Sequence, residues 1–196
     1  MTKLYFVRHA QPEHGWKDDF TRPLTKEGVE DSKKVTELLK DVIFDYCVCS
    51  PYKRSKDTIK ECALQHGLDI REDIRLRERE SNNGNTKEMI KERWLDFDKH
   101  EEGGESLKMV QNRNIEAILE LLQENEGETI LIGTHGTALS MIINYFDNNF
   151  GFDDFWRIID FTPYIISMEF NKDILISKKE LLMEKKLFKD KYIIKK

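Results

Sequence analysis

The sequence LYFVRHA, residues 4–10, decides the fold of this chain. Four apolar residues, Leu4 to Val7, follow one another and predict a short buried strand. Arg8 and His9 come directly after them, at the point where that strand is expected to end. A similar order, an apolar run followed by a cation or a histidine, returns further along the chain after other predicted strands.

Strands and helices alternate along the rest of the sequence. Periodic apolar residues predict helices, and short apolar runs predict strands. Helices are expected at residues 25–40, 52–66, 86–100, 106–126 and 136–147, and strands at 4–7, 44–49, 70–76 and 129–133, with a hairpin formed by 164–170 and 174–178. This order predicts an α/β protein, a three-layer α/β/α sandwich with a mostly parallel sheet.

Length and composition favour a single soluble domain over residues 1–196. The 32 Lys and Arg residues are outnumbered by 37 Asp and Glu residues, a net charge of −5, and no nucleic-acid partner is expected because such proteins are basic. No apolar stretch is long enough for a signal peptide or a membrane span, so no membrane partner is expected. The three cysteines are expected to stay reduced, and together these features predict a cytoplasmic protein.

Cationic and nucleophilic side chains follow three of the predicted strands. Arg8-His9 follows the first strand, residues 50–54 follow the second, and His135-Gly136 follows the strand at 129–133. Ligands bind at the carboxyl ends of the strands in a parallel sheet, so these segments are expected to converge on one crevice. Glu78, after the weaker strand at 70–76, is expected to approach this crevice from the side.

The same segments resemble the motifs of the histidine phosphatase superfamily, also called the phosphoglycerate mutase-like family. Its Arg-His-Gly motif corresponds to Arg8-His9-Ala10, its Ser-Pro-x-x-Arg motif to residues 50–54, and its Leu-x-Glu motif to residues 76–78. A Gly-Gly-Glu-Ser run at 103–106 and a His-Gly pair at 135–136 complete the set, and residues 23–28 match the approach to the first helix. The motifs occur in the family's order over residues 4–170, which implies a phosphoglycerate mutase-like fold.

The resemblance implies a site for phosphoryl transfer, and the residue types suit that chemistry. Arg8 and Arg54 carry guanidinium groups that match phosphate oxygens, and a protonated His135 would add a third donor. His9 is the expected nucleophile: one ring nitrogen attacks phosphorus while a backbone carbonyl holds the other. Glu78 is the expected general acid, which protonates the leaving group and then activates water.

The resemblance also implies Gly136 and Gln11 as phosphate-binding positions, although Ala10 stands where the family has glycine. No cofactor is implied. No metal is implied either, since the sequence has no HxH, HExxH or Asp-rich spacing. The implied enzyme is a metal-independent phosphomonoesterase of the histidine acid phosphatase type, and its partner is a small-molecule phosphate ester.

Several alternatives stay open at this point. Glu80 competes with Glu78 for the role of acid, and Glu13 is a more distant candidate. A phosphoglycerate-type mutase is the main alternative function. Dedicated mutases have a first motif resembling Arg-His-Gly-Glu-Ser and tend to be longer, whereas this chain continues with Gln11 and Pro12, which favours hydrolysis. A non-catalytic phosphoester-binding protein is disfavoured by the retained motif residues, and a metallohydrolase by the missing metal spacing.

Substrate identity and oligomeric state are not encoded in any recognisable motif. Specificity is expected to come from the loop at 11–22 and from a lid-like insertion at 81–104. Two roles stay open for Trp94, Phe97 and His100 of this insertion: a lid over the substrate, or a small satellite core, which is the favoured prediction. The hairpin and the Lys-rich tail occupy residues 164–196, and the tail is expected to be solvated and partly ordered.

Overall fold

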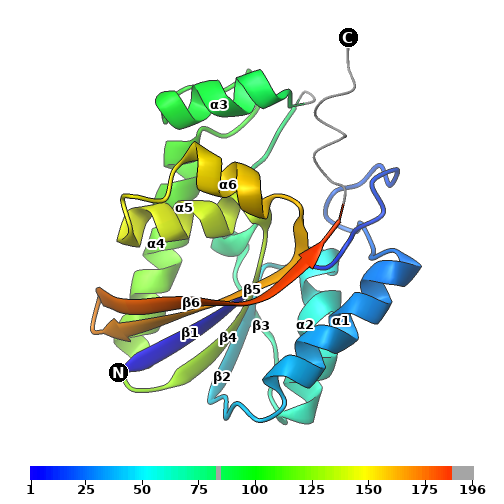
Figure 1. The fold of residues 1–196 in the computed structure, drawn as a ribbon, viewed down its shortest axis with the longest axis vertical. Coiled ribbons are helices and arrows are strands. Elements are labelled where there is room, and N and C mark those ends of the chain that lie inside the picture. The colour runs from blue at the N-terminus through cyan, green and yellow to red at the C-terminus, as the bar shows by residue number, and fades with distance from the viewer. Residues whose placement is uncertain (83–84, 187–196) are drawn as a thin grey trace.

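A six-stranded mixed sheet forms the centre of the molecule in the computed structural model, which describes residues 1–82 and 85–186 (Figure 1). The strands are β1 (Thr2–Arg8), β2 (Tyr46–Cys49), β3 (Arg71–Glu72), β4 (Thr129–Thr134), β5 (Phe161–Asn171) and β6 (Ile174–Lys185). Their order in the sheet is β3-β2-β4-β1-β5-β6. β1 to β4 run parallel, whereas the β1–β5 and β5–β6 pairs are antiparallel.

Helices cover both faces of this sheet. They are α1 (Lys26–Leu39), α2 (Lys53–Gln65), α3 (Lys87–Leu95), α4 (Leu107–Glu124), α5 (Gly136–Phe146) and α6 (Phe152–Ile158). Figure 1 shows α1 and α2 on one side of the sheet and α4, α5 and α6 on the other. This arrangement confirms the predicted three-layer α/β/α sandwich.

Alternate residues of β1 pack into different cores. Leu4 and Phe6 belong to the core beneath α4, α5 and α6, whereas Val7 packs with residues of α1 and α2. Successive side chains of a strand point to opposite faces, so a strand covered on both faces needs an unbroken apolar run. β4 follows the same rule, with Ile130 in the first core and Leu131 in the second.

The three cysteines lie in the second core and are free thiols. Burial raises the pKa of Cys47 to about 12 and that of Cys62 to about 11. Both thiols are therefore protonated at neutral pH and behave as small apolar side chains.

The predicted strand at 70–76 is wrong over most of its length. Only Arg71 and Glu72 pair with β2, and Ile74–Leu76 forms a short 3-10 helix, η1. The side chain of Asp73 accepts a hydrogen bond from the backbone N–H of Arg75 at 2.8 Å, which turns the chain and ends the strand. This turn buries Leu76 in the core and directs the following residues across the carboxyl ends of the strands.

Other differences lie in the second half of the chain. The helix expected at 86–100 ends at Leu95, and α6 was not predicted. The hairpin is longer than predicted, with strands of 11 and 12 residues. Part of the Lys-rich tail is therefore strand, and Lys186 forms ion pairs with Glu27 and Asp31 of α1. The rest of the tail, residues 187–196, lies outside the described residues. Within the described ranges, no helix is long and apolar enough to cross a bilayer.

Candidate active site

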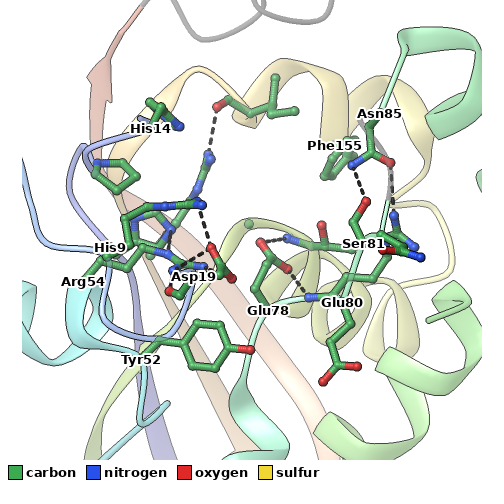
Figure 2. A pocket seen from close by; sticks show the side chains of 18 of the residues that line it. His9, His14, Asp19, Tyr52, Arg54, Glu78, Glu80, Ser81, Asn85 and Phe155 are labelled. Carbon is green, nitrogen blue, oxygen red and sulfur yellow. Dashed lines mark hydrogen bonds and ion pairs between the residues drawn. The ribbon is translucent and has the colours of Figure 1, made fainter. Parts of the chain in front are cut away.

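The carboxyl ends of β1, β2 and β4 meet at one edge of the sheet. The register pairs Arg8 with Thr134 and Cys49 with Gly133, so all three strands end at the same level. The backbone N–H of His9 donates to the carbonyl of Thr134, and that of Ser50 donates to the carbonyl of Gly133. The sheet therefore brings the three predicted segments together, and Figure 2 shows the pocket they line.

His9 is held with one ring nitrogen engaged and the other facing a guanidinium group. Its Nδ1 lies 2.8 Å from the carbonyl oxygen of Ala10, which makes Nδ1 the protonated nitrogen. Its Nε2 accepts a hydrogen bond from Nε of Arg54 at 3.3 Å. Burial, and then the charges of Arg54 and Arg8, hold the pKa of His9 well below its usual value. The ring is therefore neutral, with the Nε2 lone pair directed at the Arg54 guanidinium.

Arg54 lies in the first turn of α2, with a side chain that is 3% exposed. Its Nη1 donates to the backbone carbonyl of Asp19 at 2.7 Å, and its Nη2 lies 3.3 Å from Oδ2 of the Asp19 carboxylate. The guanidinium carbon lies 5.0 Å from the centre of the Tyr52 ring. The loop at 11–22 thus reaches into the site through Asp19, a residue that the sequence motifs did not single out.

Arg8 is fixed by the part of the chain that follows α5. Its Nη1 donates to the carbonyls of Ile158, Ile159 and Phe161 at 2.9, 3.0 and 3.0 Å. A Cβ atom at Gly136 would lie 3.2 Å from the guanidinium carbon of Arg8, so the absence of a side chain there gives Arg8 its space. The end of α6 therefore positions a residue of β1.

His135 lies behind His9 and is fully buried. Its Nε2 lies 2.8 Å from the hydroxyl oxygen of Ser50, and its ring centre lies 5.2 Å from that of His9. Its Nδ1 is buried and has no hydrogen-bond partner among the described residues. Burial and the Arg54 charge hold the pKa of His135 well below its usual value, so the ring is neutral in this structure.

Glu78 accepts hydrogen bonds at the N-terminus of α5. Its two carboxylate oxygens accept from the backbone N–H groups of Thr137 at 3.1 Å and of Ala138 at 3.2 Å. Glu80 also lines the cavity, but it pairs with Arg77 and its side chain is 55% exposed. In Figure 2 the Glu80 carboxylate points away from the middle of the pocket, whereas that of Glu78 points toward α5. Between the two rival acids, the geometry favours Glu78.

Arg113 of α4 braces the segment that carries Glu78. Its Nη1 donates to the carbonyls of Arg75 and Arg77, and its Nη2 donates to the carbonyl of Glu78 at 3.1 Å. Glu105 of the Gly-Gly-Glu-Ser run accepts from Nε and Nη2 of the same guanidinium. No local pattern marked Arg113, because its function depends on a turn that the sequence did not predict.

Gln11 is not brought into the site. Its side-chain oxygen lies 3.3 Å from the hydroxyl of Thr25, and its backbone carbonyl accepts from the N–H of Thr25. A Cβ atom at Gly28 would lie only 2.3 Å from that carbonyl oxygen, so this contact holds the loop against the start of α1. Gln11 lies outside the lining of the cavity, and the phosphate-binding position implied for it has no support in this arrangement.

The cavity in front of His9 has a volume of about 1000 Å³. Its lining contains five Lys and Arg residues and three Asp and Glu residues, so it is locally cationic although the chain is acidic. The insertion supplies a polar wall that includes Ser81, Asn85 and Thr86. Trp94 and Phe97 pack instead against Leu107, Val110 and Met141, which confirms the predicted satellite core. The described residues contain no cluster of three or more His, Cys, Asp or Glu that could hold a metal ion.

The parallel part of an α/β sheet thus presents a neutral histidine and two buried arginines at the carboxyl ends of its strands. Residues 4–173 match the family described as the histidine phosphatase superfamily (branch 1), and the chain belongs to that superfamily. This confirms the resemblance noted in the sequence motifs.

Relatives and solved structures agree with this family. A probable phosphoglycerate mutase, GpmB of Salmonella choleraesuis, is 26% identical over an alignment of 165 residues, and the match covers 74% of this chain and 74% of the relative. Bacillus stearothermophilus YhfR has a TM-score of 0.74 and 24% identity, covering 90% of this chain and 95% of its own. Phosphoserine phosphatase from Entamoeba histolytica, solved in complex with 3-phosphoglyceric acid, has a TM-score of 0.75 and 19% identity, covering 96% of this chain and 100% of its own. At these identities the solved structures show a common fold.

Proposed function

We propose that this protein is a phosphomonoester hydrolase that forms a phosphohistidine intermediate on His9. The observation that carries the proposal is the orientation of the His9 ring. Its Nδ1–H is fixed on the Ala10 carbonyl at 2.8 Å, and its Nε2 lone pair faces the Arg54 guanidinium at 3.3 Å. A phosphoryl group bound to Arg54 would thus lie next to the nucleophilic nitrogen.

In the binding step, the phosphoryl group meets the positive charges of two buried arginines. Arg8 and Arg54 are 4% and 3% exposed, and buried guanidinium groups interact with phosphate oxygens more strongly than exposed ones. His135 is fully buried and lies outside the lining of the cavity, with its Nε2 2.8 Å from the Ser50 hydroxyl, so in this geometry the two arginines are the groups that meet the phosphoryl oxygens. These groups stabilise the negative charge on the equatorial oxygens as phosphorus moves between its two partners.

In the first chemical step, Nε2 of His9 forms a bond to phosphorus and the ester oxygen leaves. The Ala10 carbonyl stabilises the positive charge that develops on the ring, because it accepts from Nδ1–H. Glu78 gives its proton to the leaving oxygen.

In the second step, water attacks phosphorus and the bond to Nε2 breaks. Glu78, now a carboxylate, takes the proton from the water, and inorganic phosphate is released with His9 neutral again. The polar cavity of about 1000 Å³ gives water access to this intermediate. Neither step calls for a metal or a cofactor, and the substrate is a small-molecule phosphate ester.

A mutase is the second candidate, and one observation favours it: the sequence relative from Salmonella is named as a probable phosphoglycerate mutase. The solved structures of similar fold include a phosphoserine phosphatase and a mycobacterial glucosyl-3-phosphoglycerate phosphatase, the latter with a TM-score of 0.72 and 18% identity, covering 94% of this chain and 99% of its own. A mutase must keep the phosphohistidine dry until the product reorients. The wide, polar cavity supports hydrolysis instead.

Steady-state assays with p-nitrophenyl phosphate in the presence of EDTA test the proposal. Phosphate release is expected, with an acid-labile phosphoenzyme trapped on rapid quenching. His9→Ala is expected to abolish both signals, and His100→Ala, at an exposed histidine, serves as the matched control. Full turnover by His9→Ala would refute the nucleophile. A preference for interconverting 2- and 3-phosphoglycerate over releasing phosphate would establish the mutase.

A further inference from the structure

Asp19 contacts the guanidinium group of Arg54, which the proposed function assigns to phosphate binding. Nη1 of Arg54 lies 2.7 Å from the Asp19 carbonyl oxygen and 3.2 Å from Oδ1 of its carboxylate. Nη2 lies 3.3 Å from Oδ2. The remaining nitrogen, Nε, donates to Nε2 of His9. Each of the three guanidinium nitrogens of Arg54 therefore already has an acceptor within the protein.

The loop presents Asp19 to the site through a local turn. The Asp18 carboxylate accepts from the backbone N–H of Phe20 at 3.1 Å and from the hydroxyl of Thr21. The Phe20 carbonyl accepts from the N–H of Lys53, next to Arg54 in α2. The loop is thus attached to the same helix turn that carries Arg54, which places the carboxylate on its guanidinium group.

The Asp19 side chain has solvent and a second cation beside it. Its side chain is 46% exposed, in contrast with the 3% exposure of Arg54. Its Oδ1 lies 2.8 Å from Nη1 of Arg22, which also lines the cavity. A carboxylate that swings toward Arg22 and solvent keeps one cationic partner and gives up the other. Figure 2 shows Asp19 between Arg54 and Glu78, inside the pocket.

We propose that Asp19 competes with the phosphoryl group for Arg54. This inference rests on the proposed function. A carboxylate and a phosphate dianion repel each other, and both require the same donors. Displacing Asp19 costs free energy whenever a phosphoryl group binds, so Asp19 lowers the affinity of the site for inorganic phosphate, the product of the reaction.

Binding of inorganic phosphate to Asp19→Asn, measured by isothermal titration calorimetry, tests the proposal. The amide has nearly the same shape but no charge, and phosphate is expected to bind about two- to fivefold more tightly, as removal of one partly exposed ion pair implies. Asp19→Ala removes both charge and acceptor and is expected to show at least the same gain. Glu30→Gln removes one charge from the exposed face of α1 and is the matched control, with unchanged affinity.

The opposite role for Asp19 would be to hold Arg54 in place for phosphate. In that case both variants would bind phosphate more weakly, and this result, or unchanged binding, would overturn the proposal. The measurement needs no turnover. If the variants bound phosphate more tightly but the protein had no phosphatase activity, the competition by Asp19 would be supported and the proposed phosphatase function refuted. If the protein were an active phosphatase but the variants bound phosphate more weakly, only the competition by Asp19 would be refuted.

Discussion

Arg113 and Glu105 face each other as a bidentate ion pair, with Nε to Oε1 and Nη2 to Oε2 both at 2.8 Å. The two side chains are 12% and 7% exposed. Arg113 also donates hydrogen bonds to three backbone carbonyls, those of Arg75, Arg77 and Glu78. The pair therefore links the long helix α4 to the segment that presents the proposed acid, although neither residue reaches the nucleophile.

Replacing Arg113 by Met is expected to lower the free energy of unfolding by about 3 kcal/mol, because Glu105 would keep a buried charge without its main partner. Chemical denaturation in urea measures this loss. The double variant Arg113→Met, Glu105→Gln is expected to regain part of the stability while turnover of alkyl phosphates stays low, since Glu78 would still lack its brace. Full recovery of turnover in the double variant would show that Arg113 has no part in positioning the acid.

Removing the proposed acid is expected to affect esters according to their leaving groups. Glu78→Gln should reduce kcat for alkyl phosphates by about 10²- to 10⁴-fold, the usual contribution of general acid catalysis. The loss should be much smaller for p-nitrophenyl phosphate, whose leaving group needs no proton. Glu80→Gln is the matched control, because its side chain is paired with Arg77 and 55% exposed. Equal losses in the two variants would contradict the assignment of Glu78.

The two buried histidines predict how stability depends on pH. Both have pKa values held well below 6.5 in the folded state, so the unfolded chain binds more protons in acid and stability is lost as the pH falls below about 6.5. Each contributes a slope of about 1.4 kcal/mol per pH unit there. Urea titrations between pH 5.5 and 7.5 measure the slope, a range in which carboxylates of the unfolded chain scarcely titrate.

The His9→Asn variant is expected to show about half of the wild-type slope in that range. His100→Ala should keep it, because His100 is exposed. A slope that is the same in His9→Asn and in the wild type would mean that burial of His9 does not set the acid limit of stability.

Gly136→Ala is expected to disturb Arg8 directly. The new methyl group would lie 3.2 Å from the guanidinium carbon, closer than side chains normally pack, so Arg8 would have to shift and phosphate binding should weaken. We expect kcat/KM for p-nitrophenyl phosphate to fall about tenfold, the effect of a small misplacement of a binding group. Gly15→Ala is the control, because no atom of the described residues lies within 4 Å of a Cβ there. An unchanged kcat/KM would show that Arg8 tolerates the displacement.

Much of the fold follows from short-range patterns. The runs at 4–7 and 129–133 are unbroken because β1 and β4 are covered on both faces, and the helices that cover them have periodic apolar residues. Helix α6 escaped prediction because it has only seven residues, too few to show a helical period. The strand expected at 70–76 failed because the side chain of Asp73 competes with strand pairing, a local hydrogen bond that apolar patterns do not report.

Some residues of the candidate site could be predicted from the sequence, and others could not. His9, Arg54 and His135 were predicted because each follows a strand, and the parallel register brings the strand ends together. Asp19 and Arg113 were missed because their importance comes from contacts with distant parts of the chain. Asp19 contacts a residue 35 positions away, and Arg113 contacts residues that are 35 to 38 positions away. Gln11 was predicted as a phosphate-binding residue because it follows the Arg8-His9-Ala10 motif in the chain. Its side chain instead contacts the hydroxyl of Thr25.

The contacts of Arg8 have a consequence for biosynthesis. Its guanidinium rests on carbonyls that are 150 to 153 residues further along the chain. A ribosome that has made the first 150 residues has already produced His9, Arg54 and His135, but not the backbone that fixes Arg8. The position of Arg8 is thus fixed only when α6 and the start of β5 have emerged and joined the fold.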